Sequence, residues 1–443
     1  MNFSGNYRTQ ADFYNNLSLG APGVPNDNKT FIESRALLDP EVVIDDHFVV
    51  NSQWSLLNSP TLSTSAIDGG QGGYIFGDPS ASALVFNRAW LEWTSDFGVL
   101  RVGRMPFSWG YGLIWDAGDN IWDNFQTTLD RIEYRLHLGH VIGGIAYSKP
   151  LKLSVLDDEN DGDFYTVFLQ YNNPESDVEA GILYEKQARS TTQAAELTQN
   201  APTQPGQAVN PRYNPYQLPS NYSNPYSLSV NTPWPISNNV VDLYLKKSID
   251  YFSFGGEVGW LSGTSAYGGQ FDSLNALAVT LNAAFELHSF KAFIEALYAS
   301  GDDNLSAGHN NGFELLHRNR SPGLILGQEL LGAYAGNNVG WGNLTVYGNQ
   351  NSFSGVFYVH PGVRVDWTPS FSTGAEMVLA RKASVQQGEG TNLGVELDIS
   401  AEYAIYKNFI VGGEAGYLFA GDGILAGTSA GAIGVRTTVG LKF

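Results

Sequence analysis

Strict alternation of apolar and polar side chains at the end of the chain is the feature that most constrains its fold. In residues 431–443 most odd positions are apolar, from Ile433 to Phe443, and the even positions are small or polar, as at Arg436 and Lys442. Because successive side chains of a strand point to opposite faces, this stretch predicts a strand with one apolar and one polar face. Taken alone, it fits either the wall of a membrane barrel or the edge strand of a soluble sandwich.

The same alternation recurs along the whole chain, in about eighteen segments separated alternately by tight turns and long loops. In 131–138, Ile132 and Tyr134 face one way, and Arg131 and Glu133 face the other. We expect strands near residues 3–14, 30–38, 47–57, 83–95, 99–107, 131–138, 140–149, 163–172, 177–189, 239–248, 251–263, 272–287, 290–300, 352–368, 371–383, 392–406, 408–420 and 431–443. We expect periplasmic turns at residues 96–98, 138–139, 249–250 and 368–370.

A polar face on nearly every strand decides between the two readings. A soluble protein would have to hide a very large apolar surface, whereas in a membrane that surface meets lipid. The sequence contains no run of about 18 apolar residues, so it predicts no transmembrane helix. We therefore predict an all-β protein: a transmembrane antiparallel up-and-down β-barrel of about eighteen strands, with short periplasmic turns and long extracellular loops. We expect a single domain over residues 1–443, because the alternating segments follow one another along the whole chain without a linker.

Composition narrows the compartment and the chemistry. The chain has no cysteine, which excludes disulfides and thiolate metal sites, and its net charge of −20 argues against nucleic acid as a partner. A terminal amphipathic strand ending in Phe resembles the insertion signal of bacterial outer-membrane barrels, so we interpret Phe443 as that signal. This predicts a Gram-negative outer-membrane location, with outer-membrane lipid, lipopolysaccharide and the barrel-assembly machinery as partners. No signal peptide is visible, and we expect the chain to be the mature form.

Several motifs resemble one family. Leu100–Arg104, then Trp109–Gly112 and Asp130–Arg135, resemble the Gly-Arg-Gln strand and the following loop of the alginate-export porins. Leu393–Asp398 and Gly413–Phe419 are similar to their C-terminal strands, and Ile294–Tyr298 with Gly301 and Asp302 resembles another of their strands. The resemblance implies a single-chain, eighteen-stranded outer-membrane barrel that releases an anionic polysaccharide. Met105 departs from the pattern at the position where the family favours Gln.

The charges on the polar face predict the chemistry of the lumen. A barrel of about eighteen strands is too wide to be filled by its own side chains and leaves an aqueous channel. Basic residues gather on the early strands and the last strand: Arg8, Arg88, Arg101, Arg131, Arg135, Arg436 and Lys442. Acidic residues gather on the strands from 251 to 420: Glu257, Glu286, Glu295, Asp366, Glu376, Glu396, Asp398, Glu402 and Glu414.

Two interpretations of these charges stay open. Facing arcs of opposite sign would create a transverse field across the pore. Alternatively, neighbours pair along the wall, for instance Arg88 with Glu92 or Arg364 with Asp366. The acidic arc at least balances the basic one, so we expect no anion selectivity. In this respect the lumen differs from the arginine-lined pore that the resemblance implies. Arg104 would face lipid by strict alternation, and we expect a bulge at Pro106 to re-aim it.

Long loops supply further candidates. Residues 190–237 and 301–351 are long enough to narrow the pore, and the second carries Arg318, Arg320 and an apolar run at 324–331 that would plug the lumen or pack on a partner. Between Asp157 and Asp163 the chain holds a compact set of carboxylates and a glycine. Asp157, Asp161 and Asp163 are candidate ligands of a structural Ca²⁺, although a solvated acidic loop explains the same residues. We expect no other cofactor.

These features favour a channel. We expect passive transport of hydrophilic solute or export of a secreted polysaccharide through an outer-membrane porin. The alternative is a barrel subunit of a larger outer-membrane secretion, motility or surface-assembly complex with no pore function of its own. The sequence contains no His-Glu-x-x-His motif, and we expect no enzyme.

Overall fold

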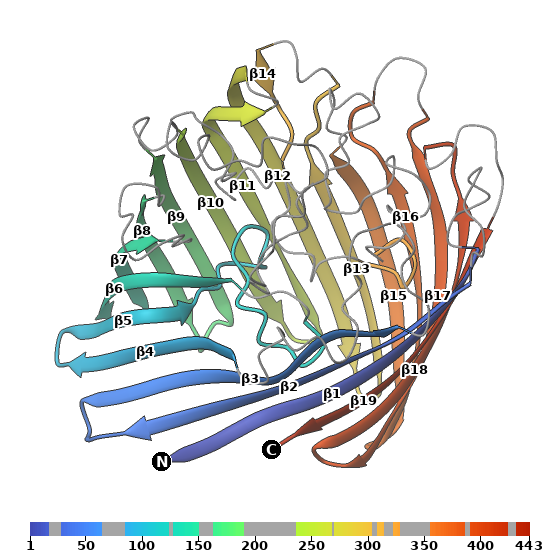
Figure 1. The fold of residues 1–443 in the computed structure, drawn as a ribbon, viewed down its shortest axis with the longest axis horizontal. Coiled ribbons are helices and arrows are strands. Elements are labelled where there is room, and N and C mark those ends of the chain that lie inside the picture. Colours follow the sequence, from blue (N-terminus) through green and yellow to red (C-terminus); the bar gives the residue numbers. More distant parts are fainter. Residues whose placement is uncertain are drawn as a thin grey trace, which may run out of the picture.

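The described strands form one closed barrel (Figure 1). The computed structural model describes residues 1–16, 28–63, 85–123, 127–149, 163–189, 236–267, 270–303, 308–313, 322–327, 355–385, 390–423 and 431–443. The strands are β1 (Asn2–Asn15), β2 (Lys29–Val43), β3 (Phe48–Ser63), β4 (Val85–Ser95), β5 (Gly98–Pro106), β6 (Thr128–Leu138), β7 (Val141–Lys149), β8 (Asp163–Asn173), β9 (Val178–Arg189), β10 (Ile236–Ile249), β11 (Phe252–Tyr267), β12 (Gln270–Leu287), β13 (Phe290–Ala299), β14 (His309–Asn310), β15 (Val356–Thr368), β16 (Phe371–Arg381), β17 (Asn392–Tyr406), β18 (Phe409–Ala420) and β19 (Gly431–Lys442). Among these residues no helix is long and apolar enough to cross a membrane.

The ring is closed by its first and last strands. Strand β1 pairs antiparallel with β2 on one side and with β19 on the other, and the two termini lie close together in Figure 1. Eighteen antiparallel strands make the wall, and the short β14 adds to it by pairing in parallel with β12. The predicted barrel of about eighteen strands is therefore confirmed. Closure leaves no unpaired edge, which a bilayer requires because lipid cannot hydrogen-bond to the backbone.

The two ends of the barrel differ in their connections. At one end, here the short-turn end, hairpins join Leu138 to Val141, Ile249 to Phe252 and Leu287 to Phe290. These two-residue loops contain Gly139, Asp250 and His288 at positive φ, the conformation that tight hairpin turns demand. The strand pairs that are separated by longer stretches of sequence, including β5 with β6 and β9 with β10, are joined at the opposite end, the long-loop end. This asymmetry matches the predicted one.

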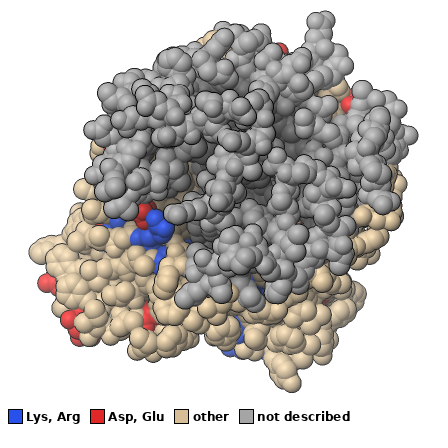
Figure 2. Space-filling view, viewed as in Figure 1, with Lys and Arg blue, Asp and Glu red and all other residues tan. Residues whose placement is uncertain are grey.

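Each wall strand separates two environments. In β8, Phe164, Thr166 and Phe168 are buried on one face, while Val167 and Leu169 are half-exposed on the other. The exposed apolar face recurs around the ring and forms the lipid-facing band. In Figure 2 most of the described surface that faces the viewer is uncharged.

Arg104 stays on the outward face. The pairing of β5 with β4 and with β6 runs without a register shift, so the bulge expected at Pro106 is wrong. The guanidinium instead forms a bidentate ion pair with Asp130, at 2.7 and 2.8 Å, near the long-loop end.

Candidate functional site

The connection between β5 and β6 lies inside the barrel. Its described part up to Asp123, residues 107–123, is named here the inward segment, and it lies within the ring of strands in Figure 1. Most of its apolar side chains are almost fully buried, with Trp109, Leu113 and Ile114 at 2% exposure or less. Side chains of a surface loop would not be buried in this way, so the segment narrows the lumen.

Strands β10 and β11 hold the tip of the inward segment. Trp109 Nε1 donates a hydrogen bond to Asp242 Oδ1 at 3.1 Å. The carboxylate of Glu257 accepts from the backbone N–H groups of Tyr111 and Leu113, the latter at 3.2 Å. Gly110 makes this approach possible, because its φ is +56° and a Cβ there would lie 2.6 Å from Glu257 Oε2.

Arginines on the other side of the ring hold the rest of the segment. Arg88 on β4 forms an ion pair with Asp119 at 2.8 Å. Arg8 on β1 donates to the carbonyl of Ile121 at 3.0 Å, and Arg35 on β2 donates to the same carbonyl at 3.1 Å. In ring order β1 and β2 lie roughly opposite β10 and β11, so the segment is fastened across the lumen.

Aromatic packing completes the fastening. The Trp109 ring meets those of Phe168 and Tyr244 edge-on, at centroid distances of 5.7 and 5.1 Å. Trp115 packs against Phe164 at 6.2 Å. These aromatic pairs add to the burial energy of the rings themselves.

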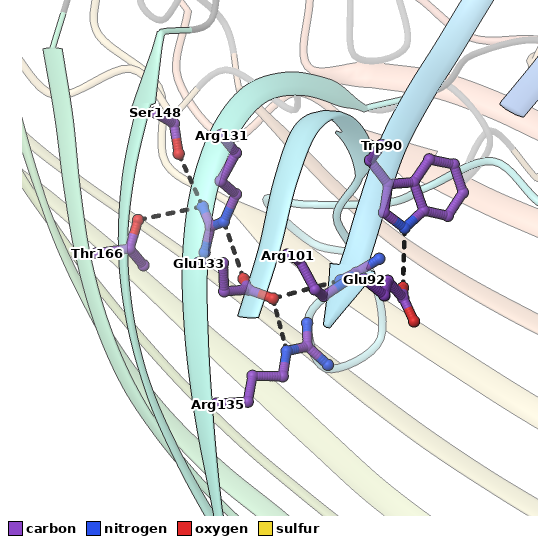
Figure 3. A network of polar contacts seen from close by, with 8 residues as sticks. All are labelled: Trp90, Glu92, Arg101, Arg131, Glu133, Arg135, Ser148 and Thr166. Atoms are coloured by element: carbon purple, nitrogen blue, oxygen red, sulfur yellow. Dashed lines mark hydrogen bonds and ion pairs between the residues drawn. The ribbon is translucent and has the colours of Figure 1, made fainter. Parts of the chain in front are cut away.

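Three predicted basic residues converge on one carboxylate (Figure 3). Arg101, Arg131 and Arg135 reach Glu133 at 3.3, 2.8 and 2.6 Å. Arg101 also forms an ion pair with Glu92 at 3.0 Å. The carboxylate of Glu92 accepts a hydrogen bond from the indole N–H of Trp90. The network lies on the polar face of β4, β5 and β6, and Arg131 extends it to β7 and β8 through Ser148 and Thr166.

A second segment folds onto the inner wall. Residues 322–327, named here the strap, place Leu324, Ile325 and Leu326 in buried positions. Glu396 accepts from the N–H groups of Ile325 and Leu326, each at 2.6 Å, and Asp398 accepts from Leu324 at 3.4 Å. The described part of the expected apolar run thus contacts the interior face of β17.

The strap also reaches the strands that close the ring. Tyr14 on β1 donates its hydroxyl to the carbonyl of Leu324 at 3.3 Å. A Cβ on Gly434 of β19 would lie 3.0 Å from both Leu324 and Ile325. The strap therefore packs on three strands of the inner wall.

The remaining predicted charges lie in local pairs. Arg436 contacts Asp12 at 2.7 Å and Glu414 at 3.9 Å, and Glu376 contacts His360 at 2.9 Å. The other pairs join Glu295 to Tyr358, Glu286 to Lys291, and Arg364 to both Asp366 and Glu402, while Lys442 is exposed at the short-turn end.

Wall pairing therefore accounts for part of the two arcs. The expected pair of Arg364 with Asp366 is present at 3.2 Å, whereas Arg88 pairs with Asp119 and not with Glu92. Several predicted pore-lining residues fasten the inward segment or the strap instead of standing free in the channel.

One titratable group outside the spanning strands has a displaced pKa. Burial raises the pKa of Asp123 to about 6, against the opposing hydrogen bond from the Asn120 backbone N–H at 2.7 Å. Asp116 nearby raises it further, and Arg35 opposes. Asp123 lies at the end of the inward segment that is fastened to β2.

Sequence reasoning missed the inward segment and several of its anchors. Asp242 and Arg35 were not predicted, although each lies among the buried alternate positions of its strand. Arg318, Arg320, Asp157 and Asp161 lie outside the described residues. Asp163 contacts Tyr147 at 2.6 Å and Lys149 at 3.4 Å, and the Ca²⁺ site stays a prediction.

Comparisons with known proteins place the fold. No protein-family model matches the chain, and no curated protein matches it. Among solved structures, OccK9 (OpdG) of Pseudomonas aeruginosa matches with a TM-score of 0.55 at 11% identity, over 100% of this chain and 99% of that one. OccAB1 of Acinetobacter baumannii matches with a TM-score of 0.54 at 8% identity, covering 100% and 96%. OccK11 (OpdR) of Pseudomonas aeruginosa matches with a TM-score of 0.52 at 10% identity, over 100% of this chain and 95% of that one.

The fold is that of outer-membrane porins. At such low identity the likeness extends to the fold alone. It gives no support to the specific resemblance to alginate-export porins.

Proposed function

We propose that this barrel is a passive outer-membrane pore for small hydrophilic solutes, restricted by the inward segment. The proposal rests mainly on one observation: the inward segment is fastened to β1, β2 and β4 on one side and to β10 and β11 on the other. A porin fold with a polar interior conducts water and solute, and a segment fixed across it limits the size of what passes.

The geometry favours small solutes over a polymer. A polysaccharide would have to pass a segment held by ion pairs, backbone hydrogen bonds and buried tryptophans. The motifs around Leu100–Arg104 that resemble alginate-export porins keep a secreted glycan as the second candidate cargo. The paired interior charges suit polar solutes of either sign and support the expectation of weak ion selectivity.

Conductance in planar bilayers tests the proposal. We expect the unmodified protein to give small, discrete conductance steps. The double variant Arg35→Gln with Glu257→Gln weakens the fastening on both sides of the lumen, and its steps should be larger and noisier. A barrel that stays silent both before and after this change would contradict the pore and favour a subunit of a larger assembly.

Liposome swelling distinguishes the two cargoes. Swelling rates in sugars of increasing size should fall steeply for the unmodified protein and less steeply for the double variant. Ready entry of long oligosaccharides into liposomes carrying the unmodified protein would contradict the small-solute proposal and restore the glycan.

A further inference from the structure

A row of charged side chains interrupts the apolar outer surface at the long-loop end. Arg104 on β5 is bound to Asp130 on β6, and Asp130 lies opposite Lys149 on β7. Lys149 forms an ion pair with Asp163 on β8 at 3.4 Å. The signs therefore alternate across four adjacent strands, at one level of the wall and on the face opposite to the lumen.

A third cation extends the row onto β9. Lys186 lies opposite Tyr165, one step nearer the apolar band than Asp163. Its amino group donates to Ser237 Oγ at 2.8 Å and to Asn239 Oδ1 at 3.3 Å, both on β10. Within the described part of the chain, this ammonium group contacts neutral oxygens. We name Arg104, Asp130, Lys149, Asp163 and Lys186 the outer row.

The outer row lies at the boundary of the lipid-facing band. One step along the strands toward the short-turn end are Tyr147, Tyr165 and Tyr184, and these are followed by Ile145, Val167 and Ile182, which are about half exposed. Tyrosines at the edge of an apolar band mark the membrane–water interface. The tyrosines and the row are linked directly, because the Tyr147 hydroxyl donates to Asp163 at 2.6 Å.

We infer that the outer row binds the phosphorylated sugar headgroup of an outer-leaflet lipid of the lipid A type. Among the described residues, three cations stand beside two carboxylates at the level where such headgroups lie, in a protein whose net charge is −20. Asp130 and Asp163 hold Arg104 and Lys149 in position, so less side-chain freedom is lost when a phosphate binds. The tyrosine hydroxyls add partners for the sugar, and the apolar side chains below contact the acyl chains. The inference rests on the proposed outer-membrane location.

The test compares two variants in detergent solution. The row variant carries Arg104→Gln, Lys149→Gln and Lys186→Gln. The control is Arg381→Gln, because Arg381 is an exposed, outward-facing cation at the same end but on β16. Thermal unfolding is followed with and without bisphosphorylated lipid A, and phosphatidylethanolamine and inorganic phosphate serve as comparison probes.

Lipid A should stabilise the unmodified protein and the control equally. Each cation near an anionic headgroup contributes about fivefold to affinity, so the row variant should bind lipid A at least about tenfold more weakly. Equal loss in the control and the row variant would overturn the inference, as would equal stabilisation by inorganic phosphate. If the row variant fails to fold, Lys186→Gln alone must still weaken binding, since this change leaves both ion pairs intact. If the protein conducts normally but does not bind lipid A, the inference about the outer row is wrong and the proposed pore function is unaffected.

Discussion

Carboxyl groups on the inner wall bind the backbone of the segments that lie inside the lumen. Glu257 accepts from the N–H groups of Tyr111 and Leu113, and Glu396 accepts from Ile325 and Leu326. A charged acceptor shared by two backbone donors forms stronger hydrogen bonds than a neutral acceptor does. One residue of the wall can therefore fix the position of a whole segment in the lumen.

Gly110→Ala should widen the pore. The new Cβ would lie 2.6 Å from Glu257 Oε2, so the tip of the inward segment must leave its anchor. The matched control is Gly139→Ala, at φ +61° in a hairpin turn where a Cβ would meet nothing within 4 Å. Both changes should cost about 1 kcal/mol of backbone strain. Larger conductance steps are expected for Gly110→Ala alone, and equal steps in both variants would contradict the anchoring role of Glu257.

Asp123 should give a pH-dependent contribution to stability. Its folded pKa is raised to about 6 from an ordinary value of 3.8, so the folded state binds the proton more tightly than the unfolded state. The stabilisation is present below pH 3.8 and is lost as the pH rises through 6. Relative to Asp123→Asn, the unmodified protein should lose on the order of 1 kcal/mol across this window, after allowance for solvent screening. Thermal unfolding of both proteins between pH 3.5 and 7 measures the difference, and a flat difference would refute it.

At the scale of whole elements, the strands could be predicted and the inward segment could not. Strand positions follow from a local rule, since each alternation is visible in its own ten residues, and all eighteen expected strands are present. Expected ends were less accurate, as in β3, which reaches Ser63, and β15, which starts at Val356. The inward segment is apolar and rich in glycine, with no periodicity of its own. Its position depends on Asp242 and Glu257, which are more than 130 residues away from Trp109 and Tyr111.

Loop length was also a misleading guide to the constriction. The sequence points to 190–237 and 301–351 because they are long, and of these the structure describes only parts, including the strap. The shorter inward segment carries the described cross-lumen contacts. Its Trp109–Gly112 motif was visible, but only as part of a family resemblance. The signal that the sequence offers is the presence of tryptophans beside glycines in a connection between two strands.

Selectivity should respond to the exposed acids at the short-turn end of β15 and β17. Arg364 is held between Asp366 and Glu402 at 3.2 and 3.1 Å. Asp366→Asn with Glu402→Gln leaves this cation without both partners, so the reversal potential in a salt gradient should move toward anions, and more at low salt. The control pair Glu286→Gln with Lys291→Gln removes one charge of each sign and should leave the potential unchanged. Strong anion selectivity of the unmodified protein would contradict the weak selectivity expected here.

At the scale of the whole molecule, the barrel depends on the meeting of its two ends. Phe443 and Gly5 exchange backbone hydrogen bonds at 2.9 and 3.1 Å, beside the pairing of β1 with β19. The Phe443 ring lies against Gly5, where a Cβ would come within 2.8 Å of it. The last residue therefore takes part in closure, whether or not it is also an insertion signal.

Removal of Phe443 should reduce membrane-inserted barrel in cells. The truncated chain loses both the terminal aromatic residue and its bonds to Gly5, so less heat-modifiable protein is expected in gel electrophoresis of membranes. Phe97→Ala is the control, because Phe97 is equally an exposed aromatic residue, in the turn between β4 and β5. If the truncated chain is inserted normally at ordinary expression levels, Phe443 is not an insertion signal.

The fastening of the inward segment also dictates an order of assembly. Its partners Arg8 and Arg35 lie near the start of the chain, whereas Asp242 and Glu257 lie beyond its middle. These groups face one another only after the wall has curved round and the two ends of the chain have joined. Contacts between residues far apart in the chain form late, because loop-closure entropy must be overcome first. We therefore expect docking of the inward segment to follow closure of the wall, as a late step of assembly.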